Sequence, residues 1–395
     1  MLKFTTSGES HGKGLIGIIE GLPAGLEISD EFINQELRKR QKGYGRGARM
    51  GIETDTIEIF SGVRNCRTLG SPVSFLIRNK DHENWRDIMG TGECSKLDER
   101  VVSRPRPGHA DLVGAIKYNH SDMRNVLERS SARETACRVA AGAFFKQLLD
   151  QFNIYIYSQV VSIGNVKAEP WKVERENIEQ LKKAVEESPL CCPHKIYEDK
   201  MMQLIDRARE AGESAGGSFE VGAVGVLPGL GSYVSWDNRL DGQLAQLLMS
   251  IPAIKAVEIG EGVENSGRPG SEVHDEIYYN ETLGIYRKTN RAGGIEGGIS
   301  NGETLWARAY MKPIPTLYKP LVSVNTNTWC EQKADVERSD ICAVPAAAIV
   351  GEAVLAFGIA RAFLVKFGGD SIDHIKGSYQ GYRDYVEKVW RWRKI

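Results

Sequence analysis

The chain has 395 residues, which is enough for one large domain or two ordinary ones. Its 51 basic and 52 acidic residues nearly cancel, which excludes a global charge that would attract nucleic acid or an anionic membrane. We expect no apolar run as long as a membrane span and no secretory signal, and therefore a cytoplasmic protein.

The first part of the chain predicts strands and one capped helix. Leu15–Ile19 is a strand that ends at a Gly-Leu-Pro turn. Ser29 is placed to cap a helix that runs through Arg40, because acidic residues follow it and basic residues close the helix. Alternating polar and apolar residues predict a further strand at Thr56–Phe60, and another strand is predicted at Val73–Ile77.

The middle of the chain alternates between helical and strand patterns. Apolar residues at helical spacing predict a helix over about Arg133–Phe152. An exposed helical region is expected at about 171–212, with helices at Trp171–Glu187 and Lys200–Ala211. A short helix is predicted at Leu240–Met249. The predicted strands are Ile154–Ser162, Phe219–Val226, Thr304–Met311 and Leu321–Val324.

Val344–Phe367 predicts a long helix that is apolar nearly all round. A helix without a polar face is covered on more than one side, which favours helices sandwiched between sheets. The basic and aromatic run Tyr385–Ile395 is expected to pack against a surface or a partner. No proline- or serine-rich linker divides the chain, so we interpret residues 1–395 as a single domain.

The segment Arg104–Asp111 holds two arginines, a histidine and a carboxylate on a stiff backbone. Its two prolines fix φ, and Gly108 lets the main chain approach a ligand closely. A second histidine, His11, lies in a similar glycine-rich setting within residues 7–12.

Other segments favour anion binding, although each also has a plainer structural interpretation. Arginines alternate with glycines over Arg40–Arg49, a pattern equally typical of a mobile basic loop. Arg129–Thr135 precedes the strong helix, where Ser130 or Ser131 serves as a cap and the positive helix end attracts anions. The glycine-rich run at 290–302 lacks the dinucleotide-binding spacing, so a nicotinamide-binding Rossmann unit is not expected.

Taken together, the chain resembles the chorismate synthase family. Seven segments between residue 7 and about residue 370 carry the resemblance, in this order: SGESHG, KGYGRGARM, RPGHAD, RNVLERSSARETA, RAGGIEGGISNG, MKPIPTLYKP and ERSDICAVPAAAIVGEAVLAF. The resemblance implies an α+β fold, a β-α-β sandwich with helices packed between antiparallel sheets, assembled as a homotetramer.

The resemblance also implies the reaction. The family converts 5-enolpyruvylshikimate-3-phosphate to chorismate and phosphate, a 1,4-elimination that is the last step of the shikimate pathway. It needs reduced FMN, and NADPH serves as the reductant where an enzyme also reduces its own flavin. No nucleic acid or membrane partner is implied, and we assign no metal site.

Carried over residue by residue, the resemblance implies three sets of site residues. His11 would act on the leaving phosphate. His109 would lie by the flavin N1 region and stabilise charge there, and Asp340 would help to tune the flavin N5. Substrate binding would fall on Ser10, Arg40, Arg46, Arg49, Arg106, Ser131 and Arg133. FMN contacts would fall on Arg129, Ser130, Ser131, Ala253, Gly297, Lys312, Pro313, Ile314, Pro315, Thr316 and Arg338. Pro252 stands where relatives often carry asparagine, so one flavin contact is in doubt.

Two other classes of protein stay open. A flavin reductase, or another flavoenzyme with net redox chemistry, would need a nicotinamide site. A non-enzymatic anion-binding scaffold would use the arginine loops without catalysis, but it leaves His11 and His109 without a purpose.

Overall fold

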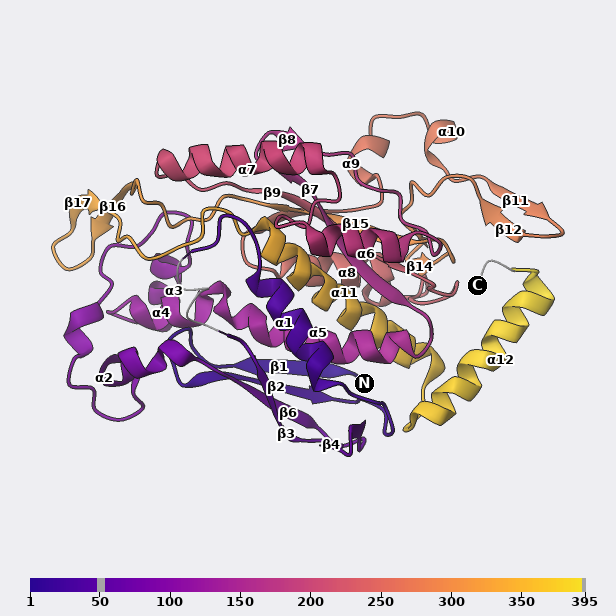
Figure 1. Cartoon of the computed structure of the whole chain (residues 1–395), viewed down its shortest axis with the longest axis horizontal. Coiled ribbons are helices and arrows are strands. Elements are labelled where there is room, and N and C mark those ends of the chain that lie inside the picture. The colour runs from indigo at the N-terminus through magenta and orange to yellow at the C-terminus, as the bar shows by residue number, and fades with distance from the viewer. Residues whose placement is uncertain (48–53, 393–395) are drawn as a thin grey trace.

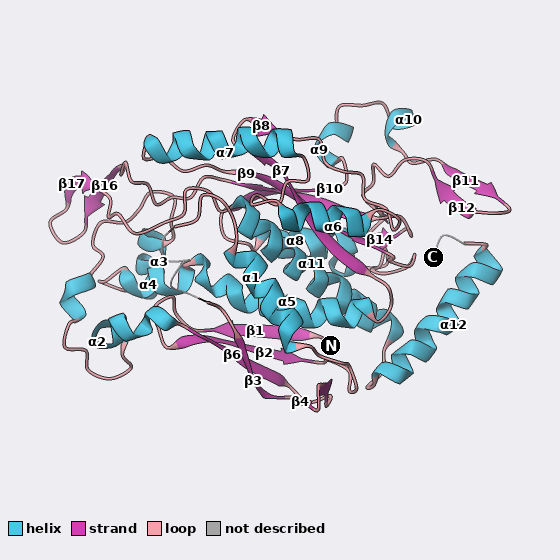
Figure 2. Ribbon diagram, viewed as in Figure 1, coloured by secondary structure: helices cyan, strands magenta, loops and turns pink. Residues whose placement is uncertain are grey.

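Two antiparallel sheets enclose a layer of helices in this computed structural model, which describes residues 1–47 and 54–392 (Figure 1, Figure 2). The first sheet has the order β1-β2-β6-β3, with β1 Lys3–Ser7, β2 Gly14–Glu20, β3 Ile57–Ser61 and β6 Val73–Arg78. The second has the order β10-β15-β9-β7-β8, with β7 Tyr155–Ile163, β8 Val166–Lys167, β9 Gly217–Val224, β10 Ile254–Ile259 and β15 Leu305–Met311. This arrangement confirms the predicted α+β sandwich.

Four helices pack against one another and against these sheets: α1 Asp30–Gln41, α5 Thr135–Asp150, α8 Leu240–Met249 and α11 Val344–Phe367. The other helices are α2 Arg86–Met89, α3 Asp111–Tyr118, α4 Arg124–Ser130, α6 Ile178–Glu187, α7 Lys195–Glu210, α9 Gly262–Asn265, α10 Gly270–Val273 and α12 Ile372–Trp390. Short hairpins are β4 Val63–Arg64 with β5 Arg67–Thr68, β11 Ile277–Asn280 with β12 Gly284–Arg287, β13 Ile295–Glu296 with β14 Ile299–Ser300, and β16 Val322–Asn325 with β17 Cys330–Lys333.

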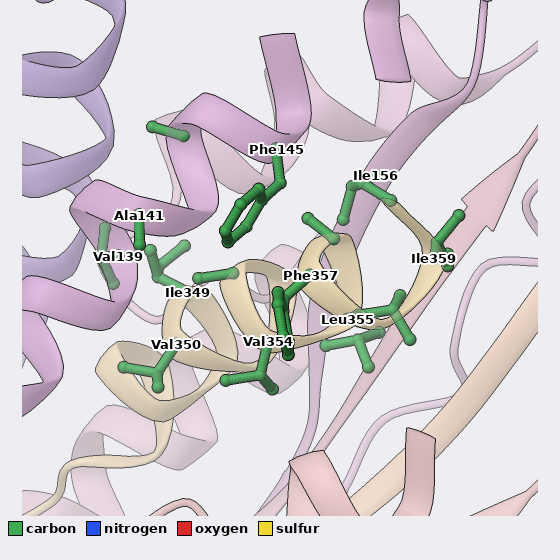
Figure 3. Close-up of a cluster of buried hydrophobic side chains, with 14 of the residues drawn as sticks. Val139, Ala141, Phe145, Ile156, Ile349, Val350, Val354, Leu355, Phe357 and Ile359 are labelled. Atoms are coloured by element: carbon green, nitrogen blue, oxygen red, sulfur yellow. The ribbon is translucent and has the colours of Figure 1, made fainter. Parts of the chain in front are cut away.

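α11 is the central helix of the layer and is buried nearly all along its length. It packs on α5, where the ring centroids of Phe145 and Phe357 lie 5.2 Å apart, and it also contacts β7 and β9 (Figure 3). By length and composition alone α11 is long and apolar enough to cross a membrane, yet 83% of its most apolar stretch is buried inside the structure. The expectation that no apolar run reaches that length is therefore wrong, and this run is a core helix covered from two sides.

The contact between α5 and α11 depends on a glycine. A Cβ atom at Gly142 would lie 2.3 Å from the Cβ of Ala353 and 2.5 Å from its Cα. We expect Gly142→Ala to lower the free energy of unfolding by about 1–3 kcal/mol because the helices must separate. This loss outweighs the gain of about 1 kcal/mol that alanine has over glycine within a helix.

Gly377→Ala in α12 is the matched control for this prediction. Nothing lies within 4 Å of the Cβ that this substitution adds, so the variant should be as stable as the parent or more stable. Urea denaturation of both variants measures the difference. Equal changes in the two free energies of unfolding would contradict the close approach of α5 and α11.

Residues 171–177 are not helical, so the predicted helix from Trp171 is wrong in its first part. The buried side chain of Gln159 on β7 donates to the Trp171 carbonyl and accepts from the Trp171 main-chain N–H, both at 2.9 Å. These two hydrogen bonds hold the segment against the outer face of the sheet, and α6 begins only at Ile178. The second helix of the region, α7, begins at Lys195 rather than Lys200.

Candidate active site

His11 lies in the loop between β1 and β2 and is held from three sides. Its main-chain N–H donates to Glu128 Oε2 at 2.7 Å, and its ring Nδ1 lies 2.8 Å from Glu128 Oε1. Its ring stacks on Trp85, with centroids 3.9 Å apart. The side chain of Glu128 is 1% exposed, so its contacts with His11 are buried. The imidazole is therefore fixed through Nδ1, and Nε2 is the ring nitrogen that remains for a ligand.

Asn79, directly after β6, links this histidine loop to Arg133. The amide nitrogen of Asn79 donates to the carbonyls of Glu9 and Gly12, at 3.0 and 2.8 Å. Its amide oxygen accepts from Arg133 Nε at 2.9 Å. The predicted histidine loop and the predicted substrate arginine are therefore neighbours in the fold.

Arg40 and Arg133 share one buried carboxylate, that of Asp55. Arg133 Nη1 donates to both Asp55 oxygens, at 2.6 and 2.8 Å, and Arg40 Nη1 lies 3.6 Å from Oδ2. Burial, together with the nearby cations Arg46 and Arg133, lowers the pKa of Arg40 to about 10 against the opposing pull of Asp55. One carboxylate cannot neutralise two guanidinium groups, so this place has an excess of positive charge that favours an anion.

Arg46 and Asp340 come together at the edge of the same cluster. Arg46 Nη1 lies 3.1 Å from Asp340 Oδ2, and the Gly47 N–H donates to Asp340 Oδ1 at 2.7 Å. Asp340 also contributes to the electrostatic surroundings of Arg40. The predicted partner Arg49 lies outside the described residues.

The second histidine loop forms its own charged cluster. Asp111 is fully buried and accepts from Arg106 Nε at 2.8 Å and from Arg106 Nη2 at 3.0 Å. His109 Nδ1 lies 2.5 Å from Asp111 Oδ1. Burial raises the pKa of Asp111, but hydrogen bonds from His109 and Arg106 outweigh burial and hold it well below its usual range. The carboxylate is thus ionised at neutral pH and holds both side chains.

This loop also contacts the segment predicted to bind FMN. Arg106 Nη1 donates to Thr316 Oγ1 at 2.8 Å, and Lys312 Nζ donates to the Gly108 carbonyl at 2.6 Å. Gly108 has a φ of +82°, and a Cβ there would lie 3.1 Å from Lys312 Nζ. Glycine therefore allows the close approach of the lysine.

Residues 335–340 join the two histidine clusters. Asp335 binds Arg104, Glu337 accepts from Arg124 Nη2 at 2.6 Å, and Asp340 binds Arg46. Arg124 in turn lies 3.5 Å from Glu128, the carboxylate that holds His11. The segment 335–340 therefore contacts the chain next to both histidine loops.

The other predicted FMN residues lie at different distances from this cluster. Ser131 caps the turn before α5 by accepting from the Arg133 N–H at 3.3 Å, and Arg129 donates to the carbonyls of Thr6 and Gly8. The Ala253 carbonyl accepts from the Lys312 N–H at 3.0 Å. No hydrogen bond from the side chain of Arg338 is observed in the part of the chain that the structure describes.

Gly297 is not brought to the site by the fold of one chain. The neighbouring Gly298 carbonyl accepts from the Leu240 N–H at 2.9 Å, at the start of α8. Ala253 follows the other end of this helix, and ten residues of helix span about 15 Å. Gly297 therefore lies roughly one helix length from Ala253, at the opposite end of α8.

A large cavity lies elsewhere, on the outer face of the five-stranded sheet. Its volume is about 1260 Å³, and it is lined by residues that include Glu220, Glu258, Trp306 and Arg308. None of the predicted site residues lines it. The candidate anion-binding site is recognised by its converging positive charges rather than by the depth of a cavity.

Four residues that position the site had no predicted role: Asp55, Asn79, Trp85 and Glu128. Asp55 and Asn79 lie in ordinary polar surroundings in the sequence, and their arginine partners are 78 and 54 residues away. Glu128 stands within the arginine- and serine-rich segment before α5, which is the one signal that marked it.

Comparisons with known proteins point to one family. Residues 2–364 match the family model described as chorismate synthase. The chain is 67% identical over 395 residues to the chorismate synthase of Syntrophomonas wolfei, covering 100% of both chains. It is 54% identical to that of Desulforamulus reducens, over 98% of this chain and 100% of the relative. A crystal structure of chorismate synthase superposes with a TM-score of 0.80 at 44% identity, covering 98% of each chain.

Proposed function

The chain belongs to the chorismate synthase family and is a lyase by that membership, and we propose that it converts 5-enolpyruvylshikimate-3-phosphate to chorismate and phosphate with reduced FMN. One observation carries the proposal. Two histidines are each held through Nδ1 by a buried carboxylate, and each lies by a buried arginine: His11 is linked through Asn79 to Arg133 at the start of α5, and His109 lies beside Arg106.

The arginines match the charge of this substrate. It carries two carboxylates and a phosphate, and guanidinium groups form two-point contacts with both kinds of anion. Arg40, Arg106 and Arg133 are at least nine-tenths buried, so their side chains are ordered before a ligand arrives. We assign the substrate to these three residues together with Ser10, Arg46, Arg49 and Ser131.

His11 supplies the proton for the leaving group in this proposal. Elimination breaks the bond between the substrate carbon and the phosphate oxygen, and that oxygen leaves more readily when it accepts a proton. Nδ1 of His11 is committed to Glu128, so Nε2 is the atom that delivers the proton. Histidine suits this task because its charge changes near neutral pH.

His109 and Asp340 are assigned to the cofactor side of the site. Reduced FMN, when bound, supplies electron density that lowers the barrier to elimination. His109 is held beside Arg106, and Arg106 in turn donates to Thr316 of the segment 312–316. Asp340 is held by Arg46 and the Gly47 N–H, so its carboxylate has a fixed position.

The residues around Gly108 fit an anionic cofactor. Lys312, Thr316 and the nearby arginines provide the donor types that a flavin phosphate needs, and Gly108 leaves room where a side chain would press on Lys312. Arg129, Ser130, Ser131, Ala253 and Arg338 complete the set that we assign to FMN, with Pro313, Ile314 and Pro315. Gly297 joins this set only by resemblance, since the single chain holds it at the far end of α8.

We also propose that the protein assembles as a homotetramer. Support comes from large apolar side chains that a monomer leaves in water, including Val113 and Ile116 on α3 and Trp329 beside β17, which are 65, 73 and 78% exposed. Light scattering after size-exclusion chromatography should give four times the mass of one chain. A monomeric mass at micromolar concentration would overturn this proposal.

Anaerobic turnover with chemically reduced FMN tests the function. Chorismate and phosphate should be released in equal amounts, with many turnovers per flavin and none with oxidised FMN. The same assay with NADPH and oxidised FMN shows whether the chain reduces its own cofactor. No product from folded protein that binds FMN would overturn the proposal and favour a flavoenzyme with net redox chemistry.

A further inference from the structure

Glu128 contacts the His11 loop through both its side chain and its main chain. One carboxylate oxygen accepts from the His11 main-chain N–H at 2.7 Å, while the other lies 2.8 Å from the ring Nδ1. The Glu128 carbonyl also accepts from the Ser10 N–H at 2.9 Å. These contacts join residues 117 positions apart and fix both the backbone and the ring of His11.

The ionisation state of Glu128 decides which proton the ring carries. Burial raises the pKa of Glu128, but hydrogen bonding to His11 outweighs burial and lowers it below its usual value. An ionised carboxylate only accepts hydrogen bonds, so Nδ1 of His11 must be the donor. The proton on Nδ1 is thereby fixed, and Nε2 is left to gain or lose a proton.

The cationic groups near His11 do not take over the contact of Glu128 with the imidazole. Arg124 lies 3.5 Å from Glu128 and, like Arg100, lies over the Trp85 ring at 5.3 Å. His82 contacts the His11 carbonyl through Nδ1 at 3.0 Å and does not touch the His11 ring. Glu128 is the one carboxylate that contacts the imidazole among the described residues.

We propose that Glu128 is a positioning residue for His11, which keeps the proton on Nδ1 and aims Nε2 at the phosphate that leaves. This inference rests on the proposed function, because it assigns His11 the proton transfer. It concerns a residue that acts through another side chain and does not itself touch the substrate. The carboxylate partner of a functional histidine typically contributes 10- to 100-fold to activity in metal sites, which sets the scale expected here.

Glu128→Gln is the first test, because the amide keeps the size of the side chain but removes its charge. We expect kcat to fall about 10- to 100-fold while KM changes little, since the arginines that bind the substrate are untouched. Nitrogen-15 NMR of the His11 ring should show the proton mainly on Nδ1 in the parent and divided between the two nitrogens in the variant. Glu83→Gln is the control, since Glu83 is exposed two residues before Trp85 and pairs with Arg86; it should change neither quantity.

Unchanged kcat and an unchanged Nδ1 proton in Glu128→Gln would overturn the inference. If that variant does not fold, Glu128→Ala is measured with added formate, and recovery of kcat with formate but not with chloride supports the inference. Failure of both anions to restore kcat in folded Glu128→Ala counts against it. The NMR measurement needs no turnover, so an inactive parent would refute the proposed function while the position of the His11 proton still decides the role of Glu128.

Discussion

Replacing His11 by asparagine is expected to lower kcat by about 10²- to 10⁴-fold, the usual contribution of a positioned acid or base. Asparagine is chosen because its side-chain N–H can still donate to the buried Glu128 carboxylate. Alanine would remove this donor and leave the carboxylate without it. The variant therefore removes the proton donor while retaining most of the local structure. Initial rates of phosphate release under anaerobic conditions, with reduced FMN in excess, measure the effect.

His120→Ala is the control for this experiment. His120 is exposed in the turn between α3 and α4, and no site residue contacts its side chain among those that the structure describes. Its kcat should match that of the parent. A kcat for His11→Asn within threefold of the parent, from protein with an unchanged melting temperature, would falsify the acid role of His11.

The elements that the sequence predicted best are those in which the local pattern and the tertiary environment agree. Ser29 caps α1 by accepting from the Phe32 N–H at 3.1 Å, as its position before two acidic residues predicted. α11 has the predicted bounds Val344–Phe367, because a run without a polar face must be buried whatever its neighbours are. In these cases no distant residue needed to be known.

Prediction was wrong or silent where a distant side chain decides the structure. The helical pattern from Trp171 is overridden by Gln159, which takes both main-chain groups of Trp171. The helix α12 was not predicted, although Ser371 caps it and Ile375 and Tyr379 follow at helical spacing. The aromatic and basic residues near its end were interpreted instead as a segment that packs against a surface or a partner. Local pattern is a weak guide when a competing hydrogen bond is equally available.

In the candidate site, too, residues with a local signal were predicted and residues that depend on distant partners were not. The cationic and histidine loops were predicted because prolines, glycines and arginines mark them in the sequence. Their carboxylate partners were not, since Asp55 and Glu128 acquire a role only when the fold places them beside Arg133 and His11. Sequence therefore identified the cationic and histidine side chains of the candidate site and missed the carboxylates that hold them.

A second prediction concerns the charges buried between the helices. Lys146 on α5 contacts both Glu36 on α1 and Glu352 on α11, and all three side chains are at least 89% buried. Glu352 also accepts from Ser158 Oγ at 2.5 Å. Removal of one partner from a buried ion pair leaves an uncompensated charge, so Lys146→Met is expected to lower the free energy of unfolding by about 3–5 kcal/mol.

Lys39→Met is the matched control. Lys39 Nζ lies 2.8 Å from Glu36 Oε1, but its side chain is 36% exposed, so its loss should cost about 1 kcal/mol or less. The triple variant E36Q/K146M/E352Q removes the uncompensated carboxylates as well and should recover much of the stability that K146M loses. Urea denaturation at pH 7 compares the four proteins, and equal losses in K146M and K39M would contradict the argument.

The stability lost in Lys146→Met should also depend on pH, because the ionisation of Glu36 depends on pH. Burial raises the pKa of Glu36, but Lys146 and Lys39 outweigh burial and lower it from 4.5 to about 2. A depressed carboxylate pKa stabilises the folded state above pH 4.5, by about 3 kcal/mol for a shift of this size. That contribution is lost as the pH falls through the folded-state pKa. The difference in stability between the parent and Lys146→Met should therefore narrow between about pH 5 and pH 2, and a difference that stays constant over this range would show that Lys146 does not act through the charge of Glu36.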